Sequence, residues 1–339
     1  MTNPSFENVA VMGAGAVGCY FGAMLARAGA QVQLIGRPAL VEAVTRDGLR
    51  FEGVDFSARI PLTATTDPAG VAGAGLVLFS VKSPDTETAA RAIAPHLAPG
   101  AVVLSLQNGV DNAERLGAQV ANIVVPAVVY VAAEIPAPGV LRHNGRGDLV
   151  IGQLGPRQAA DALMAKLAAY LGGAKVPTHI SDNVEGELWW KLTLNCAYNA
   201  VSALGRSRYG PMMAVPEVRQ VVAEAVREII ALAKAKGVQI AMSDPVEAVL
   251  RFGDVMPGAI SSTAQDIGRG RPTEIDYLNG YIVRECDARG LPAPINRTLH
   301  ALVKLLERAP TSSSLAGGGG REPLISTPHR DTPRGRPHR

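Results

Sequence analysis

Cysteine is scarce in this chain of 339 residues, and the three that occur, Cys19, Cys196 and Cys286, lie far apart. An odd, scattered set forms neither a disulfide framework nor the CxxC spacing of a metal site, so we expect a reduced, cytoplasmic protein. The six histidines are equally scattered, and no HExxH motif occurs. We therefore expect no metal centre.

Long hydrophobic runs are also lacking. The longest covers residues 123–133, well short of the roughly 20 residues that a membrane-spanning helix needs. No basic segment followed by an apolar one stands at the N-terminus, so we expect neither a signal peptide nor a membrane partner.

An excess of positive charge is missing from most of the chain. Lys and Arg number 33 against 30 Asp and Glu, a net charge of +3, and residues 311–339 alone hold five arginines against Glu322 and Asp331. Residues 1–310 are therefore neutral and have no electrostatic footprint for a nucleic acid. The composition of 311–339, rich in Gly, Ser, Pro and Arg, predicts a disordered tail whose deletion leaves the protein active.

What the first half does contain is short β-branched runs that alternate with Ala-rich helical stretches. This alternation is typical of a parallel α/β sheet, and the runs lack polar alternation, as in strands covered on both faces. Residues 139–153 carry spaced glycines and predict an antiparallel pair that closes the sheet. The predicted strands are 9–12, 31–35, 76–81, 102–106 and 123–131, with helices at 16–28 and 86–97.

From residue 183 the pattern changes to long helices, for example 215–236, 277–288 and 297–308. We therefore predict a Rossmann-type doubly wound parallel sheet in residues 1–182, an all-α domain in 183–310, and the tail.

A glycine-rich turn follows the first predicted strand and opens a helix; it reads Gly13-Ala14-Gly15-Ala16-Val17-Gly18. Such glycines permit a tight turn and a close approach of backbone to a pyrophosphate, which the helix N-terminus attracts. The alternative is a strand-to-helix turn without a ligand. The strand before it and the helix after it favour a dinucleotide site.

The second predicted strand ends at Arg37, and no acidic residue follows before Glu42. An arginine there meets the 2′-phosphate of NADP, whereas NAD binders carry an acid, so we favour NADPH over a merely solvated arginine. Lys82 and Asn108 follow two later strand ends, where ribose, phosphate and nicotinamide ligands lie. Each also has a plain alternative, a surface lysine and an ordinary Asn-Gly turn.

Lys191, Asn195 and Asn199 are spaced four apart and form one stripe on a predicted helix. The alternative is a solvated face on which Glu187 and Lys191 pair. Tryptophans and leucines around the stripe favour burial and hence a site. Residues 261–276 are dense in polar groups and predict, on their own, a capped loop in which Thr273 precedes a helix.

Taken together, these motifs, with Gln107-Asn108-Gly109, Ser261-Ser262 and the run 273–280, resemble the ketopantoate reductase family (2-dehydropantoate 2-reductase) over about residues 8–308. The resemblance implies NADPH-dependent reduction of 2-dehydropantoate to (R)-pantoate, towards pantothenate and coenzyme A. It also implies a helical domain like the C-terminal domain of 6-phosphogluconate dehydrogenase.

The resemblance assigns Lys191 as general acid and Glu274 as the carboxylate that binds the substrate hydroxyl. It makes Asn195, Asn199 and Ser262 substrate ligands, and adds Arg37, Lys82 and Asn108 to the cofactor ligands of the glycine turn. Ala259 departs from the pattern, because some members carry an asparagine there.

Two other functions stay open. One is an NADP-dependent reductase of another 2-keto or 3-hydroxy acid, such as a β-hydroxyacid dehydrogenase, although the glycine-rich substrate segment of that group is not found. The other is a non-catalytic NADPH sensor, which would not need Lys191 and Glu274. The sequence leaves a monomer and a homodimer equally open.

Overall fold

A central run of parallel strands organises the computed structural model, which describes residues 5–154 and 159–309. Its order is β5-β2-β1-β6-β7-β8, so the chain reverses direction across the sheet between β1 and β6. Ligands of doubly wound sheets bind at the carboxyl ends of strands at such a reversal. The strands are β1 (Asn8–Met12), β2 (Gln31–Ile35), β5 (Thr63–Thr65), β6 (Leu76–Phe79), β7 (Val102–Ser105) and β8 (Ile123–Ala137).

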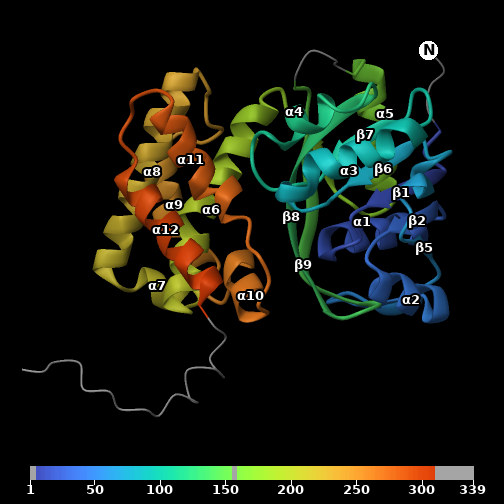
Figure 1. Cartoon of the computed structure of the whole chain (residues 1–339), viewed down its shortest axis with the longest axis horizontal. Helices are drawn as coiled ribbons and strands as arrows, with labels where there is room; N and C mark the ends of the chain where they lie inside the picture. Colours follow the sequence, from blue (N-terminus) through green and yellow to red (C-terminus); the bar gives the residue numbers. More distant parts are fainter. Residues whose placement is uncertain (1–4, 155–158, 310–339) are drawn as a thin grey trace, which may run out of the picture. The chain divides into compact units, whose positions relative to one another are not determined.

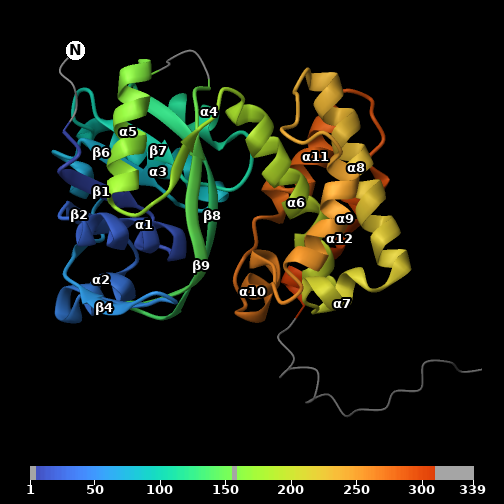
Figure 2. The same ribbon diagram turned by 180° about the vertical axis from the view of Figure 1, so that it is seen from behind.

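Helices cover both faces of this sheet, which is why its strands show no polar alternation. Val9 and Val11 point into the core under α1, α2 and α5, whereas Ala10 points into the core under α3 and α4. Figure 1 shows α3 in front of the strands, and Figure 2, the view from the opposite side, shows α5 in front of them. The helices are α1 (Ala16–Arg27), α2 (Pro38–Asp47), α3 (Thr86–Ile93), α4 (Asn112–Gly117) and α5 (Asp161–Gly173), with short 3₁₀ turns η1 (Pro68–Val71), η2 (Ser83–Asp85) and η3 (Ala94–His96).

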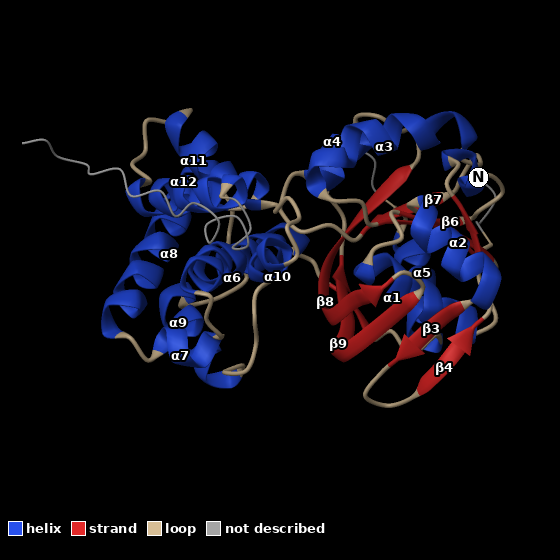
Figure 3. Ribbon diagram, turned by 60° about the horizontal axis from the view of Figure 1, so that its bottom comes forward, coloured by secondary structure: helices blue, strands red, loops and turns tan. Residues whose placement is uncertain are grey.

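The prediction of an antiparallel pair within residues 139–153 is wrong. Those residues form one strand, β9 (Val140–Ile151), whose antiparallel partner is β8. β8 continues to Ala137, and the turn at Pro138 and Gly139, where Gly139 has a φ of 74°, reverses the chain. β9 carries the sheet on to three strands that the sequence did not predict, as Figure 3 shows for two: β3 (Leu49–Glu52), β4 (Ser57–Ile60) and β10 (Thr178–Ile180).

The second half is helical, as predicted, and α6 (Val184–Gly205) lies at its centre. The Asn183 side chain caps α6 by accepting a hydrogen bond from Gly186 N at 3.1 Å. Buried side chains on opposite sides of α6, such as Trp189 and Tyr198, enter two different core clusters. The other helices are α7 (Tyr209–Met213), α8 (Pro216–Lys236), α9 (Pro245–Val255), α10 (Ser262–Gly268), α11 (Asn279–Asp287) and α12 (Pro294–Arg308), with the 3₁₀ turn η4 (Ile275–Tyr277).

Residues 261–276 are not the capped loop that the sequence predicted. They begin with α10, because Ser261 Oγ accepts a hydrogen bond from Ala264 N at 3.0 Å and so starts a helix at Ser262, twelve positions before Glu274. Thr273 and Glu274 then precede η4. Residues up to Glu307 pack as one unit, so the domain boundary at 183 stays a prediction, and the tail 311–339 lies outside the described residues.

Within residues 5–154 and 159–309, no helix combines the length and hydropathy of a membrane span.

Candidate active site

The turn between β1 and α1 has three glycines with different structural roles. Gly13 adopts a φ of 96°, and a Cβ added there would lie 2.5 Å from Val81 N. A Cβ on Gly18 would lie 2.7 Å from Gly13 O, yet a Cβ on Gly15 would meet nothing nearer than 4.0 Å. Packing therefore requires glycine at 13 and 18, whereas at Gly15 the absent side chain leaves open space.

The N-terminus of α1 has the properties of an anion site. Gly15 occupies the N-cap position without a side chain, and no acidic residue lies in the first turn. The backbone N–H groups of Ala16, Val17 and Gly18 thus have no capping side chain, and the helix dipole favours negative charge beside them. These residues fit the pyrophosphate of a dinucleotide.

Arg37 lies next to this turn. Gly13 N and Ala14 N donate to Ile35 O at 3.1 and 2.9 Å, which ties the turn to the end of β2. Arg37 is exposed and makes no side-chain hydrogen bond or ion pair with any described residue. Its guanidinium is therefore available to a ligand held at the turn.

Lys82 follows β6, but its ammonium is already engaged. Its Nζ donates to Asp266 Oδ2 of α10 at 2.6 Å and to Pro272 O, between α10 and η4, at 3.1 Å. Asn108 follows β7, and its backbone oxygen accepts from Ser83 Oγ at 3.2 Å and from Asn112 Nδ2 at 2.6 Å. The Asn108 amide makes no bond to another described residue.

Lys191 is half-buried on α6, and its Nζ donates to Val129 O of β8. Burial and the charge of Arg146 lower the pKa of Lys191 to about 8, although Glu274 and Asp148 oppose that change. The alternative of a surface pair does not hold, because Lys191 Nζ donates to Val129 O and no ion pair joins it to Glu187 among the described residues. Lys191 therefore has a pKa near the pH at which a proton donor works best.

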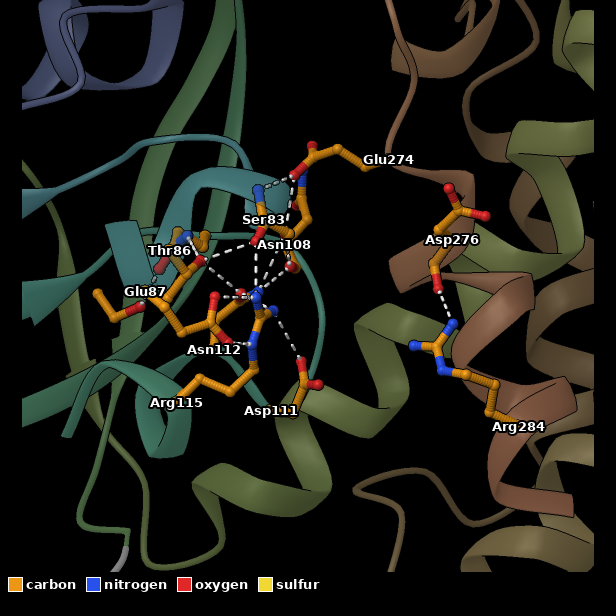
Figure 4. Close-up of polar contacts among 12 residues, drawn as sticks. Ser83, Thr86, Glu87, Asn108, Asp111, Asn112, Arg115, Glu274, Asp276 and Arg284 are labelled. Carbon is orange, nitrogen blue, oxygen red and sulfur yellow. Dashed lines mark hydrogen bonds and ion pairs between the residues drawn. The ribbon is translucent and has the colours of Figure 1, made fainter. Parts of the chain in front are cut away.

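Glu274 reaches across from the helical half to the sheet. Its Oε1 accepts hydrogen bonds from Ser83 N at 2.9 Å and Ser83 Oγ at 2.8 Å, as Figure 4 shows. Ser83 is fully buried, and Asn112 Nδ2 and Arg115 Nη2 bond its hydroxyl and carbonyl oxygens. Ser83 is not among the residues that the sequence motifs predict; its place beside Lys82 at the end of a predicted strand is the only signal for it.

The polar stripe of α6 faces α10 in part. Asn199 is buried, and its Nδ2 lies 3.5 Å from Ser262 Oγ on the first residue of α10. Asn195 is half-buried, and its amide makes no hydrogen bond with the rest of the described chain. Ala259 packs against the apolar cluster around Tyr198. The fold thus brings Asn199 and Ser262 together and leaves Asn195 free for a ligand.

No group of three His, Cys, Asp or Glu side chains could hold a metal ion in the ranges 5–154 and 159–309. A doubly wound sheet with an open glycine turn, followed by helices that bring a lysine to β8 and a carboxylate to the turn after β6, is the arrangement of a nicotinamide-dependent oxidoreductase.

Comparison with known proteins gives the family. Residues 9–156 match the family described as ketopantoate reductase PanE/ApbA, and residues 183–307 match its C-terminal part. The chain therefore belongs to the ketopantoate reductase family, which confirms the resemblance and the fold class.

This chain aligns with nearly the whole length of the individual relatives. The 2-dehydropantoate 2-reductase of Halobacterium salinarum is 35% identical over 305 residues, which are 88% of this chain and 99% of that relative. A crystal structure of a PanE/ApbA family ketopantoate reductase from Ralstonia eutropha JMP134 is 51% identical with a TM-score of 0.83, covering 88% of this chain and 98% of that one. D-Mandelate dehydrogenase, solved with NADH and anilino(oxo)acetate, is 25% identical with a TM-score of 0.82 and covers 88% and 98%.

Proposed function

We propose that this protein reduces 2-dehydropantoate to (R)-pantoate with NADPH, a step towards pantothenate and coenzyme A. The observation that carries the proposal is the half-buried Lys191, hydrogen-bonded to β8, whose pKa is lowered to about 8 mainly by burial and raised in the opposite sense by Glu274, in a fold that has an open dinucleotide turn. The activity named for the Halobacterium salinarum relative supports the choice of substrate.

In this proposal Lys191 is the general acid. Bound reduced nicotinamide supplies a hydride to the keto carbon of the substrate. As the carbonyl electron pair moves onto oxygen, Lys191 Nζ gives that oxygen a proton, so the product is an alcohol and the lysine becomes a neutral amine. Before that step the ammonium also attracts the substrate carboxylate. Its bond to Val129 O holds the side chain against β8.

Glu274 and the amide stripe orient the substrate. Ser83 occupies Glu274 Oε1, whereas Oε2 has no partner among the described residues, so we assign Oε2 to the substrate hydroxyl. Asn195, Asn199 and Ser262 are assigned to the carboxylate and keto oxygens. Each of them offers a hydrogen-bond donor.

The cofactor preference rests on Arg37. Arg37 follows the end of β2, which backbone hydrogen bonds tie to the glycine turn, and its guanidinium has no partner among the described residues, so we assign it to the 2′-phosphate. Lys82 has a third N–H left for a ribose or phosphate oxygen after its bonds to Asp266 and Pro272, and the Asn108 amide is free for the nicotinamide side.

The test mixes the protein with 2-dehydropantoate and either NADPH or NADH, and follows the absorbance of the reduced cofactor. The proposal predicts a fast loss of absorbance with NADPH and a slower one with NADH. A protein that binds NADPH tightly but consumes none with any 2-keto acid would instead be a sensor.

A second candidate is the reduction of another 2-keto acid. It is favoured by the likeness to D-mandelate dehydrogenase, solved with NADH and anilino(oxo)acetate, and by Ala259, which offers the substrate no side-chain hydrogen bond. A panel of aliphatic and aromatic 2-keto acids, compared by kcat/KM, decides between the two. A higher value for benzoylformate than for 2-dehydropantoate would favour the second candidate.

A further inference from the structure

An arginine stands over an aromatic ring beside Lys191. Arg146 Cζ of β9 lies 4.1 Å from the centroid of the Tyr130 ring on β8. Asp148 holds it there, because Arg146 Nε and Nη2 donate to the two oxygens of Asp148 at 3.0 and 2.6 Å. Two bonds to one carboxylate fix the orientation of the guanidinium plane as well as its place.

Lys191 uses the same piece of β8. Its Nζ lies 5.4 Å from the centroid of the Tyr130 ring and donates to the carbonyl of Val129, the preceding residue. Two cations therefore share one ring, although their mutual repulsion disfavours that arrangement. Asp148 provides the opposite charge that makes it tolerable.

The backbone at Arg146 is held in an unusual conformation. Arg146 has a φ of 54°, in the left-handed region that residues other than glycine seldom adopt, and the β8–β9 register shifts between Tyr130 and Val131. Bulges of this kind redirect a side chain. The strained backbone conformation costs free energy and persists only where surrounding contacts stabilise it. One such contact joins the His143 ring to Arg146 O.

We propose that Arg146 is a positioning residue for Lys191: the bulge and Asp148 hold its guanidinium over Tyr130, where it confines the Lys191 ammonium and sets when that ammonium loses its proton. This proposal rests on the proposed role of Lys191 as proton donor. Asp148 supplies the negative charge that balances Arg146.

The charges around Lys191 give the direction of each expected effect. From β9, Arg146 lowers the pKa of Lys191 and Asp148 raises it; Glu274, ahead of η4, also raises it. Glu187 stands on α6 itself, and Tyr130 stays uncharged because burial and Glu187 raise its pKa to about 12. Removing the charge of Arg146 should therefore raise the pKa of Lys191, and removing that of Asp148 should lower it.

The first measurement is the pH profile of kcat/KM for the keto acid at saturating NADPH. Because the donor must be protonated, activity falls above the pKa of Lys191. We expect Arg146→Gln to move this alkaline limb up by about 0.3 to 1 pH unit and Asp148→Asn to move it down by a similar amount. Arg50→Gln, which removes an exposed arginine paired with Glu52 on β3, should leave the limb in place.

Arg146→Gly separates a structural from an electrostatic role. Glycine accepts a φ of 54° without strain, so this variant should keep its melting temperature while it moves the limb as Arg146→Gln does. Arg146→Lys, which keeps the charge but not the pair of hydrogen bonds to Asp148, should restore most of the wild-type profile.

A second readout does not depend on turnover. The rate at which a dilute amine-acylating reagent modifies Lys191, followed by mass spectrometry across pH, reports the neutral amine directly. Opposite shifts in the Arg146 and Asp148 variants support the proposal. If they occur without any change in the activity limb, Lys191 is not the proton donor, yet its dependence on Arg146 stands. Equal or absent shifts of Lys191 reactivity in Arg146→Gly and Asp148→Asn would overturn the proposal.

Discussion

The glycine turn of β1–α1 and the lysine site of α6 are built in opposite ways. The turn is made of consecutive backbone, and the groups that we propose to bind an anion are the N–H donors of Ala16, Val17 and Gly18. The lysine site is made of side chains from remote segments, since Glu274 meets Ser83 across 191 positions and Lys191 meets Val129 across 62. A local backbone site depends on the absence of side chains, whereas the remote site depends on the presence of particular ones.

This difference predicts how each region responds to substitution. In the turn, adding one methyl group is the damaging change, and the damage depends on which glycine receives it. At the lysine site, losing a functional group is the damaging change, and the fold survives because α6 is anchored by its apolar sides.

The largest effect is expected for Lys191→Ala. Loss of the proton donor should lower kcat by about 10² to 10⁴ fold, while the dissociation constant of NADPH stays nearly unchanged because the glycine turn is intact. Stopped-flow turnover and a fluorescence titration of NADPH measure the two. Lys234→Ala, at an exposed lysine of α8, is the control and should match wild type. Equal turnover in Lys191→Ala would remove Lys191 from the mechanism.

The glycine turn should divide into two classes of variant. Gly18→Ala forces a Cβ to within 2.7 Å of Gly13 O and should destabilise the fold by about 1 to 3 kcal/mol. Gly15→Ala has room in the protein, so its melting temperature should hold while NADPH binding weakens by about tenfold or more, or about 1.4 kcal/mol. Thermal melts and NADPH titrations of both variants test this. A Gly15→Ala protein that binds NADPH like wild type would mean that no pyrophosphate lies there.

Arg37→Asp should change the choice of cofactor. Losing a charge-assisted bond to the 2′-phosphate costs about 1.5 to 3 kcal/mol, so the ratio of kcat/KM for NADPH over NADH should fall by about 10- to 150-fold. Arg91→Asp, at an exposed arginine of α3, makes the same change in net charge elsewhere in the same half and serves as the control. An unaltered ratio in Arg37→Asp, or an equal fall in both variants, would rule out the 2′-phosphate role.

The same contrast explains what could be predicted from sequence. Strands β1, β2, β6 and β7, the glycine turn and Arg37 are local patterns, and the structure has them within a few residues of the predicted bounds. The stripe on α6 follows from helical spacing alone. The course of β9 depends on pairing with β8, and α10 depends on a single cap at Ser261. Neither element can therefore be predicted from the local hydrophobic periodicity of the sequence.

Contacts between remote segments were harder still to predict. Nothing in the sequence relates Ser83 to Glu274, or Arg146 to Lys191, because each pair is joined only by the fold. Glu274 itself entered the candidate site through the family resemblance, and not through any pattern around it. Side-chain sites of this kind are found from sequence only when a family supplies the pairing.

The smallest effect is expected at Ser83. Ser83→Ala removes the 2.8 Å hydroxyl bond to Glu274 Oε1 but keeps the backbone N–H bond at 2.9 Å, so the carboxylate loses one of two donors. Because the backbone N–H bond to the same oxygen remains, we expect a loss of about 1 kcal/mol, the value of a typical hydrogen bond, and kcat/KM for the keto acid should fall about fivefold, mainly through KM. Ser57→Ala, at an exposed serine of β4, should have no effect.

A double-mutant cycle tests whether Ser83 acts through Glu274. If it does, Ser83→Ala should cost little in a Glu274→Gln background, because the orientation of a carboxylate that is no longer there cannot be lost. If the losses in kcat/KM from the two substitutions are fully additive, Ser83 stabilises the turn after β6 independently of Glu274. The Ser83–Glu274 contact would then not contribute to the lysine site, and that site would depend less on remote contacts than the comparison with the glycine turn assumes.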